Sequence, residues 1–270
     1  MDEKQKIIRV AVILLIVIVL GISAYYFFFS GRKPSAGGGV APVAAEKIEG
    51  EKLGGKDAVP VTPVDAPLDR SDEAVRSLVA DLSQNPVLAR WLRSPDLLRR
   101  FAAAVVNIAE GTSPRAQLDF FVPEGPFKTK LKGNAIVLDP ASFARYNVVA
   151  DVIDSLGTQG CARAYAASRN LLQQAYRELG YPKGDFHQTL YRAIVEVLRT
   201  PVVEDDLELE KGVTTFLIKD PKLEDLDDVQ KHLLRMGPEN LQLIQVKLRE
   251  IALALGFTDA QLPVPRPYRR

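Results

Sequence analysis

Residues 220–256 read DPKLEDLDDVQKHLLRMGPENLQLIQVKLREIALALG and predict two successive helices. Asp220-Pro221 starts the first helix, because the aspartate side chain accepts a free backbone amide and proline loses nothing at the first helical position. Gly237-Pro238 ends that helix and starts the second. The second helix carries apolar residues at helical spacing on one face: Leu241, Ile244, Leu248, Ile251 and Leu255.

The same start and stop signals recur upstream and predict five more helices, seven in all. Ser71, Ser94-Pro95, Asp139-Pro140 and Asp185 are expected to begin four of them, and Gly180 to end the fourth helix of the chain. The five ranges are about 71–82, 94–108, 139–157, 159–179 and 186–200.

Two hairpins are predicted between these helices. Residues 127–132 and 135–138 flank Gly133-Asn134, a pair that favours a two-residue turn. Residues 202–209 and 213–218 flank a second turn at 210–212, and residues 118–122 are a further strand candidate. Two hairpins among seven helices predict a predominantly α-helical α+β domain, not an alternating parallel-sheet fold.

Val10–Phe29 is a run of 20 residues without a charge. About 20 helical residues cover the roughly 30 Å hydrocarbon core of a bilayer, so this run predicts one N-terminal transmembrane helix. The basic residues before it slightly outweigh those after it, which favours a cytoplasmic N-terminus and a translocated domain. The alternative is a signal peptide cleaved after Ile22-Ser23-Ala24.

Residues 31–67 contain 7 Gly and 5 Pro and show no apolar periodicity. Such a segment buries too little apolar surface to offset its ordering entropy, so it is expected to be a flexible linker. The expected organisation is a cytoplasmic tail, a transmembrane helix, a linker, an α+β domain and a Pro/Arg-rich C-terminal tail. Their ranges are 1–9, 10–29, 30–67, 68–257 and 258–270.

Several landmarks in this order resemble a bacterial membrane-anchored family, domain of unknown function 3014. They are Leu68-Asp69, Ser71-Asp72, Leu138-Asp139-Pro140, Arg145-Tyr146, Ala175-Tyr176, Glu178-Leu179-Gly180, Asp220-Pro221, Leu223-Glu224 and the run from Gln230 to Pro238. The resemblance covers nearly all of residues 67–270 and implies a bacterial envelope setting. It supplies no catalytic residues, because the family has no established activity.

Composition and motifs point away from several functions. The net charge is +1, and residues 67–270 hold 27 cationic and 27 anionic side chains, so no nucleic-acid partner is expected. The single cysteine, Cys161, excludes an intrachain disulfide, and is expected in the core. His187 and His232 belong to no metal-binding motif, so no catalytic residue, metal or cofactor is predicted.

Lys128, Lys130 and Lys132 alternate along the first predicted hairpin and should share one face of a strand. They could contact an anionic surface such as lipid headgroups or a cell-wall polymer. Lysines on an edge strand also discourage edge-to-edge aggregation, and this structural interpretation is favoured.

Five further residues are candidate ligand or partner contacts. They are Arg145, Tyr146, Lys231, Arg235 and Asn240. Lys231 and Arg235 share a helix face that ends at Gly237-Pro238, where cations are expected to cap the last carbonyls rather than bind an anion.

These observations predict a non-enzymatic protein of the bacterial inner membrane whose periplasmic domain binds a protein or an anionic polymer of the envelope. The alternative is a hydrolase or transferase acting on wall or lipid material through dispersed carboxylates. Such an enzyme should hold carboxylates or His187 with shifted pKa values in a pocket, whereas a binding module should show a shallow groove or an apolar patch. The C-terminal tail is expected either to dock a partner or to be frayed. The oligomeric state is not predicted.

Overall fold

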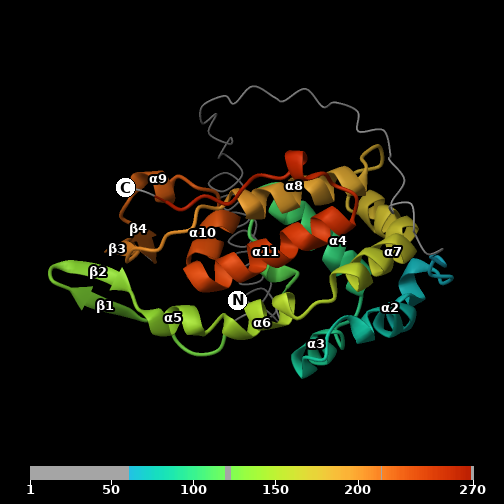
Figure 1. The fold of residues 1–270 in the computed structure, drawn as a ribbon, viewed down its shortest axis with the longest axis horizontal. Coiled ribbons are helices and arrows are strands. Elements are labelled where there is room, and N and C mark those ends of the chain that lie inside the picture. Colours follow the sequence, from blue (N-terminus) through green and yellow to red (C-terminus); the bar gives the residue numbers. More distant parts are fainter. Residues whose placement is uncertain (1–60, 119–122, 214, 269–270) are drawn as a thin grey trace, which may run out of the picture. The chain divides into compact units, whose positions relative to one another are not determined.

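The computed structural model describes residues 61–118, 123–213 and 215–268. Within these ranges the chain forms ten α-helices and one antiparallel sheet (Figure 1). The helices are α2 (Asp72–Val79), α3 (Pro86–Trp91), α4 (Leu97–Ala109), α5 (Pro140–Ala144), α6 (Asn147–Asp154), α7 (Thr158–Glu178), α8 (Phe186–Arg199), α9 (Pro221–Glu224), α10 (Asp228–Leu234) and α11 (Pro238–Ala254). The predominantly helical α+β class is therefore confirmed for the described part of the chain.

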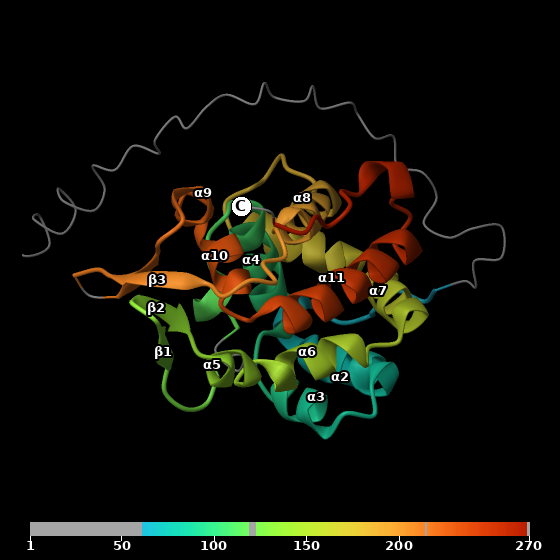
Figure 2. The same cartoon turned by 60° about the vertical axis from the view of Figure 1, so that its left-hand side comes forward.

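The two predicted hairpins join into a single sheet with the order β1-β2-β3-β4. Its strands are β1 (Thr129–Lys132), β2 (Ala135–Leu138), β3 (Glu208–Lys211) and β4 (Phe216–Ile218). The hairpins meet where β2 pairs with β3, with Ile136 opposite Leu209. The sheet lies at one end of the helices in both views (Figures 1 and 2).

Three apolar clusters hold these elements together. The largest joins α2, α4, α7, α8 and α11, and a second joins α3, α6, α8, α10 and α11. The third packs the sheet against α9 and α10. Helix α8 belongs to both of the first two clusters, through Leu190 and Ile194 on one side and Val197 on the other.

Ten helices replace the seven predicted because one was missed and two are divided. Helix α3 begins at Asn85-Pro86, where the asparagine side chain accepts from the Val87 amide at 3.0 Å. This is the same start signal as Asp-Pro. The third predicted helix breaks into α5 and α6 near Tyr146, and the sixth breaks into α9 and α10, because Asp227 caps a new helix by accepting from the Gln230 amide.

Helix α4 begins at Leu97, later than the Ser94-Pro95 signal predicted. The carboxylate of Asp72 accepts hydrogen bonds from the amides of Asp96 and Leu97 at 2.8 and 2.9 Å. A residue distant in sequence therefore provides the cap. Ser71 precedes α2 as predicted, but its hydroxyl donates to the Leu68 carbonyl instead of capping the helix.

The turns are a second point of comparison. The first hairpin turns at Gly133-Asn134, as predicted, since Lys132 pairs with Ala135. The second turn was predicted at 210–212 but lies at 212–215, because Lys211 still pairs with Phe216 and the Gly212 amide donates to the Thr215 carbonyl. The strand candidate at 118–122 falls largely outside the described residues.

The ends of the described chain pack against the helices. The Val64 amide donates to the Ala167 carbonyl at 2.9 Å, although the linker was expected to extend to residue 67. In the expected C-terminal tail, Leu262 is buried and Tyr268 donates to the carboxylate of Asp220 at 2.8 Å. Residues 258–268 are thus neither frayed nor a free docking peptide.

The predicted transmembrane helix at 10–29 lies outside the described residues. Among the residues that the structure does describe, none of the helices combines the length and the apolar character needed to cross a bilayer.

The C-terminal end of α8 is held by a buried side chain of α11. Gln245 is 1 % exposed, and its amide nitrogen donates to the carbonyls of Val197 and Thr200 at 3.0 and 2.9 Å. The last carbonyls of a helix lack the usual partner within the helix, so Gln245 supplies a donor to Thr200 and a second donor to Val197, whose carbonyl also accepts from the Thr200 amide at 3.2 Å.

Replacing Gln245 by Met keeps the side-chain volume but removes the amide, and should lower the free energy of unfolding by roughly 1–3 kcal/mol. Urea unfolding measures the difference. The matched variant Gln242→Met changes an exposed glutamine of the same helix and should have little effect. Equal losses in the two variants would contradict the role assigned to Gln245.

Candidate functional site

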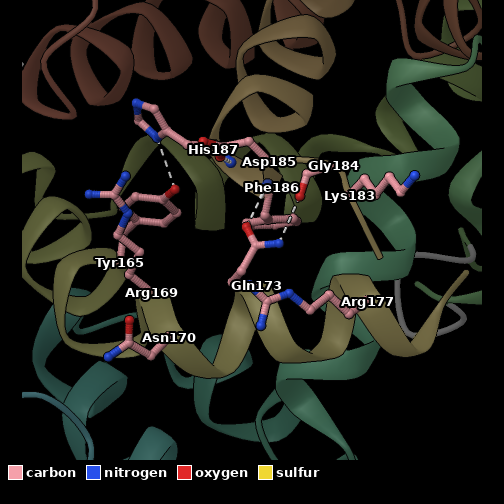
Figure 3. Close-up of a pocket in the computed structure, with 10 residues that line it drawn as sticks. All are labelled: Tyr165, Arg169, Asn170, Gln173, Arg177, Lys183, Gly184, Asp185, Phe186 and His187. Atoms are coloured by element: carbon pink, nitrogen blue, oxygen red, sulfur yellow. Dashed lines mark hydrogen bonds between the residues drawn. The ribbon is translucent and has the colours of Figure 1, made fainter. Parts of the chain in front are cut away.

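A polar cleft of about 300 Å³ lies between α7, the start of α8 and the loop that connects them (Figure 3). Most of its lining side chains are charged or polar. They are Tyr165, Arg169, Asn170, Gln173, Arg177, Lys183, Gly184, Asp185, Phe186 and His187.

One face of α7 forms a wall of the cleft. Tyr165, Arg169, Gln173 and Arg177 are four residues apart, so they lie in a row along the helix. In Figure 3, Arg169 and Arg177 lie on opposite sides of Gln173. Both arginines are exposed, and their guanidinium groups have no ion-pair partner among the described residues.

Gln173 fastens the loop to α7. Its amide nitrogen donates to the Gly184 carbonyl at 2.9 Å, and its amide oxygen accepts from the Phe186 amide at 2.9 Å. The loop backbone at residue 184 lies close to the Tyr176 ring. A glycine is needed there, since a Cβ atom would lie 2.7 Å from that ring. These contacts set the position of Lys183, the third cation of the cleft.

His187 and Tyr165 form a pair on the side of the cleft toward α8. The Tyr165 hydroxyl lies 2.9 Å from His187 Nδ1, and the imidazole stacks on Phe257 with ring centroids 4.6 Å apart. Burial and the nearby Arg169 lower the pKa of His187, so the neutral ring prevails at pH 7. Burial raises the pKa of Tyr165, so its hydroxyl stays protonated at pH 7, and the tautomer of the imidazole sets which of the two groups donates.

The cleft keeps an excess of positive charge. Its lining has three cationic side chains and one carboxylate, Asp185, whose oxygen is occupied with the His187 amide at 2.7 Å. The next acidic residue after Arg177, Glu178, is bound by Arg99 at 2.8 Å, which lowers the pKa of Glu178. The first amides of α8 are also occupied, so an anion would bind to the side chains.

The lysines predicted as a ridge lie on β1, an edge strand, or directly before it. Lys128, Lys130 and Lys132 are all exposed, and Lys132 forms an ion pair with Asp206. One of the three positive charges is therefore neutralised. The ridge is not part of the cleft.

Arg145, Tyr146 and Asn240 come together at the break between α5 and α6. The Asn240 amide nitrogen lies 3.0 Å from the Phe143 carbonyl and 2.8 Å from that of Met236, so it satisfies carbonyls at two helix ends. The Arg145 guanidinium carbon lies 5.6 Å from the centre of the Tyr146 ring, and Tyr146 is itself buried. These contacts give the three residues structural roles.

Lys231 and Arg235 were predicted to cap the carbonyls of their own helix, but they contact other elements. Lys231 pairs with Glu224 of α9 at 3.5 Å and with Asp228 at 3.7 Å. Arg235 donates to the Phe216 carbonyl of β4 at 3.5 Å. They join α10 to the rim of the sheet and lie apart from the cleft lining.

The cleft residues were missed in the sequence because Arg169 and Arg177 look like ordinary helix surface and Lys183 looks like an ordinary loop residue. The spacing of Arg169 and Arg177 by eight residues is the one local signal, since it places both on the same face of α7. Nothing local indicates that Lys183 returns to that face. His187 was expected to be structural, but it was also named as a side chain that an enzyme would hold in a pocket with a shifted pKa, and the structure places it in the cleft with a lowered pKa.

Other chemically reactive groups lie elsewhere. His232 packs edge-on against Tyr146, and burial together with Arg235 lowers its pKa. Cys161 is half-buried, and burial raises the pKa of its thiol, which disfavours a nucleophilic thiolate. Within the described ranges, no group of three potential ligands could hold a metal ion.

Glu196 of α8 forms a carboxyl pair with Asp227, the cap of α10. Burial and the hydrogen bond with Asp227 raise the pKa of Glu196 to about 7 from 4.5. The folded protein therefore retains a proton that the unfolded chain loses between these two values. Stability from this group is present below about pH 4.5 and falls as the pH rises toward 7.

Glu196→Gln keeps a hydrogen-bond donor toward Asp227 at every pH, so it should remove this loss. The difference in unfolding free energy between the variant and the parent should grow in favour of the variant from about pH 5 to about pH 8. Urea unfolding at the two pH values measures it. Glu204→Gln, at an exposed site, is the control, and a parallel pH dependence in all three proteins would exclude the pair as its cause.

Comparison with known proteins identifies the family. The model of a family described as "Protein of unknown function (DUF3014)" matches residues 97–252, more than half of the chain, from α4 into α11 and across the cleft. No curated protein and no solved structure matches the chain significantly. The family expected from the sequence landmarks is confirmed: the chain belongs to the DUF3014 family of proteins of unknown function.

Proposed function

We propose that this protein is a membrane-tethered binding module whose cleft holds an anionic component of the bacterial envelope. The observation that carries the proposal is that Arg169, Arg177 and Lys183 all line one cleft whose single lining carboxylate already caps a helix. Guanidinium groups suit phosphate and carboxylate oxygens, because their planar donors match two oxygens at once.

The loop geometry supports a preformed site. Gln173 holds both the Gly184 carbonyl and the Phe186 amide, so the loop that carries Lys183 is fixed against α7. A preformed site loses less conformational entropy on binding. Because the cations are exposed, binding should weaken as the salt concentration rises.

The alternative is a hydrolase or transferase at the same cleft, and His187 is the observation that favours it. A neutral imidazole in a pocket is suited to accept a proton. However, Nδ1 of His187 is engaged by the Tyr165 hydroxyl at 2.9 Å, and the described lining holds no second carboxylate to act as acid or base. The binding function is therefore preferred.

Binding of a short polyphosphate, as an anionic probe, should be weakened in the double variant Arg169→Gln/Arg177→Gln. Each exposed charge contact contributes up to about 1 kcal/mol, and 1.4 kcal/mol is a factor of ten, so the loss should be roughly tenfold. Titration calorimetry on the full chain at two salt concentrations measures it.

The matched control removes the same charge elsewhere. Arg90→Gln/Arg93→Gln changes two exposed arginines outside the cleft and should leave the affinity nearly unchanged. Equal weakening of polyphosphate binding in both double variants would contradict the assignment of the site to the cleft. Loss of binding only in Lys128→Gln/Lys130→Gln would assign the site to β1. Phosphate release from the same samples, abolished by His187→Ala, would favour the enzyme.

The tether is the second part of the proposal. Val10–Phe29 is apolar enough to span a bilayer, and the Gly/Pro-rich residues after it would allow the domain to search a shell near the membrane. With the N-terminus in the cytoplasm, the domain would lie outside the cytoplasmic membrane, where anionic lipids or wall polymers are accessible.

The full chain should stay with the membrane pellet after a carbonate wash, because an inserted apolar helix is not released by high pH. Replacing two residues of the apolar run, Val17→Asp and Val19→Asp, should shift the protein to the soluble fraction. Immunoblotting of both fractions reads the result. Release of the unaltered full-length chain by carbonate would rule out the span.

A further inference from the structure

A second, larger cavity of about 470 Å³ lies among α2, α3, α4, α6, α7, α8 and α11. Its lining is almost entirely aliphatic or aromatic. The inner wall includes Leu172 and Ile194, each 2 % exposed, and Phe101, 43 % exposed, also lines it and connects it with the surface. The cavity therefore reaches from the surface into the main apolar cluster.

A cavity of this volume is unusual in a protein core. Protein interiors pack as densely as organic crystals, with few voids larger than a water molecule. Apolar cavities of about 150 Å³ already stay dry and take up apolar molecules. Small-molecule sites span roughly 300–1,000 Å³, and this cavity falls in that range.

The boundary with the polar cleft indicates what the occupant looks like. Tyr165 lines both spaces, and its hydroxyl is directed to His187 on the cleft side. A molecule with a hydrocarbon chain in the cavity could therefore keep an anionic end near Arg169 and the other cations of the cleft. Apolar lining and charge complementarity both point to an anionic amphiphile.

We infer that the cavity binds one hydrocarbon chain of an anionic membrane lipid. The apolar lining holds the hydrocarbon chain of the lipid, independently of any anion in the cleft. The negative charge of the headgroup rests on the proposed function, and so does the supply of lipid by a nearby bilayer. The inference extends that function by specifying a lipid as the ligand class.

The chain contains one tryptophan and one cysteine, and Trp91 and Cys161 both line this cavity. Both residues therefore report on its occupancy without further labelling sites. Residues 1–66 contain neither type, so lipid around the predicted span gives no signal.

The test uses the full chain in vesicles of unbrominated phosphatidylcholine, titrated with dibromostearic acid. Bromine quenches a nearby indole, so Trp91 emission should fall saturably and lose most of its intensity, whereas stearic acid should cause no quenching. Stearic acid should also slow the reaction of Cys161 with a maleimide.

Ala164→Leu adds three carbon atoms at the cavity wall and should abolish quenching, whereas Gln174→Leu, at an exposed site of the same helix, should not. Absence of quenching in the parent protein, or equal quenching in Ala164→Leu, would overturn the inference. If Ala164→Leu fails to fold, the Cys161 reaction in the parent decides: protection supports the cavity site, and no protection refutes it. Absence of quenching in the parent protein together with intact polyphosphate binding would refute the cavity site alone and leave the proposed function standing.

Discussion

Helix α8 is held at both ends by glutamine amides from neighbouring helices, and the rest of the domain is arranged around it. Gln245 of α11 donates to the carbonyls of Val197 and Thr200 at the C-terminal end. Gln173 of α7 accepts from the Phe186 amide at the N-terminal end. Because free helix ends are costly to bury, these amides allow α8 to lie between two apolar clusters.

Side chains from neighbouring elements also bond to the ends of other helices and help to set where those helices begin and break. Asp72 reaches from α2 to the first amides of α4, and Asn240 reaches from α11 to carbonyls beside the α5–α6 break. Asp72 thus caps α4 from another element, and Asn240 adds a donor to a Phe143 carbonyl that also accepts from the Tyr146 amide. Helix boundaries in this domain are therefore set partly by tertiary packing.

The charged side chains divide into those with partners and those without. Arg99 forms ion pairs with Asp69, Asp96 and Glu178, and Lys231 forms one with Glu224. The cations of the cleft have no such partners among the described residues. Close to this polar surface, and sharing Tyr165 with it, lies the apolar cavity. The proposed binding of an amphiphile rests on this proximity and not on any single motif.

The sequence by itself determined the helical α+β class, the family, the bounds of α7 and α8 to within about a residue, and the turn of the first hairpin. These features depend on caps, turn residues and periodicity that act within a few positions of the chain. Only the tertiary structure decided that two hairpins form one sheet, and that Lys183 lines the same cleft as Arg169 and Arg177. It also decided that Lys231 contacts Glu224 of α9 and that Asn240 contacts the Phe143 carbonyl of α5. Contacts between residues distant in the chain depend on how the helices pack, which no local pattern encodes.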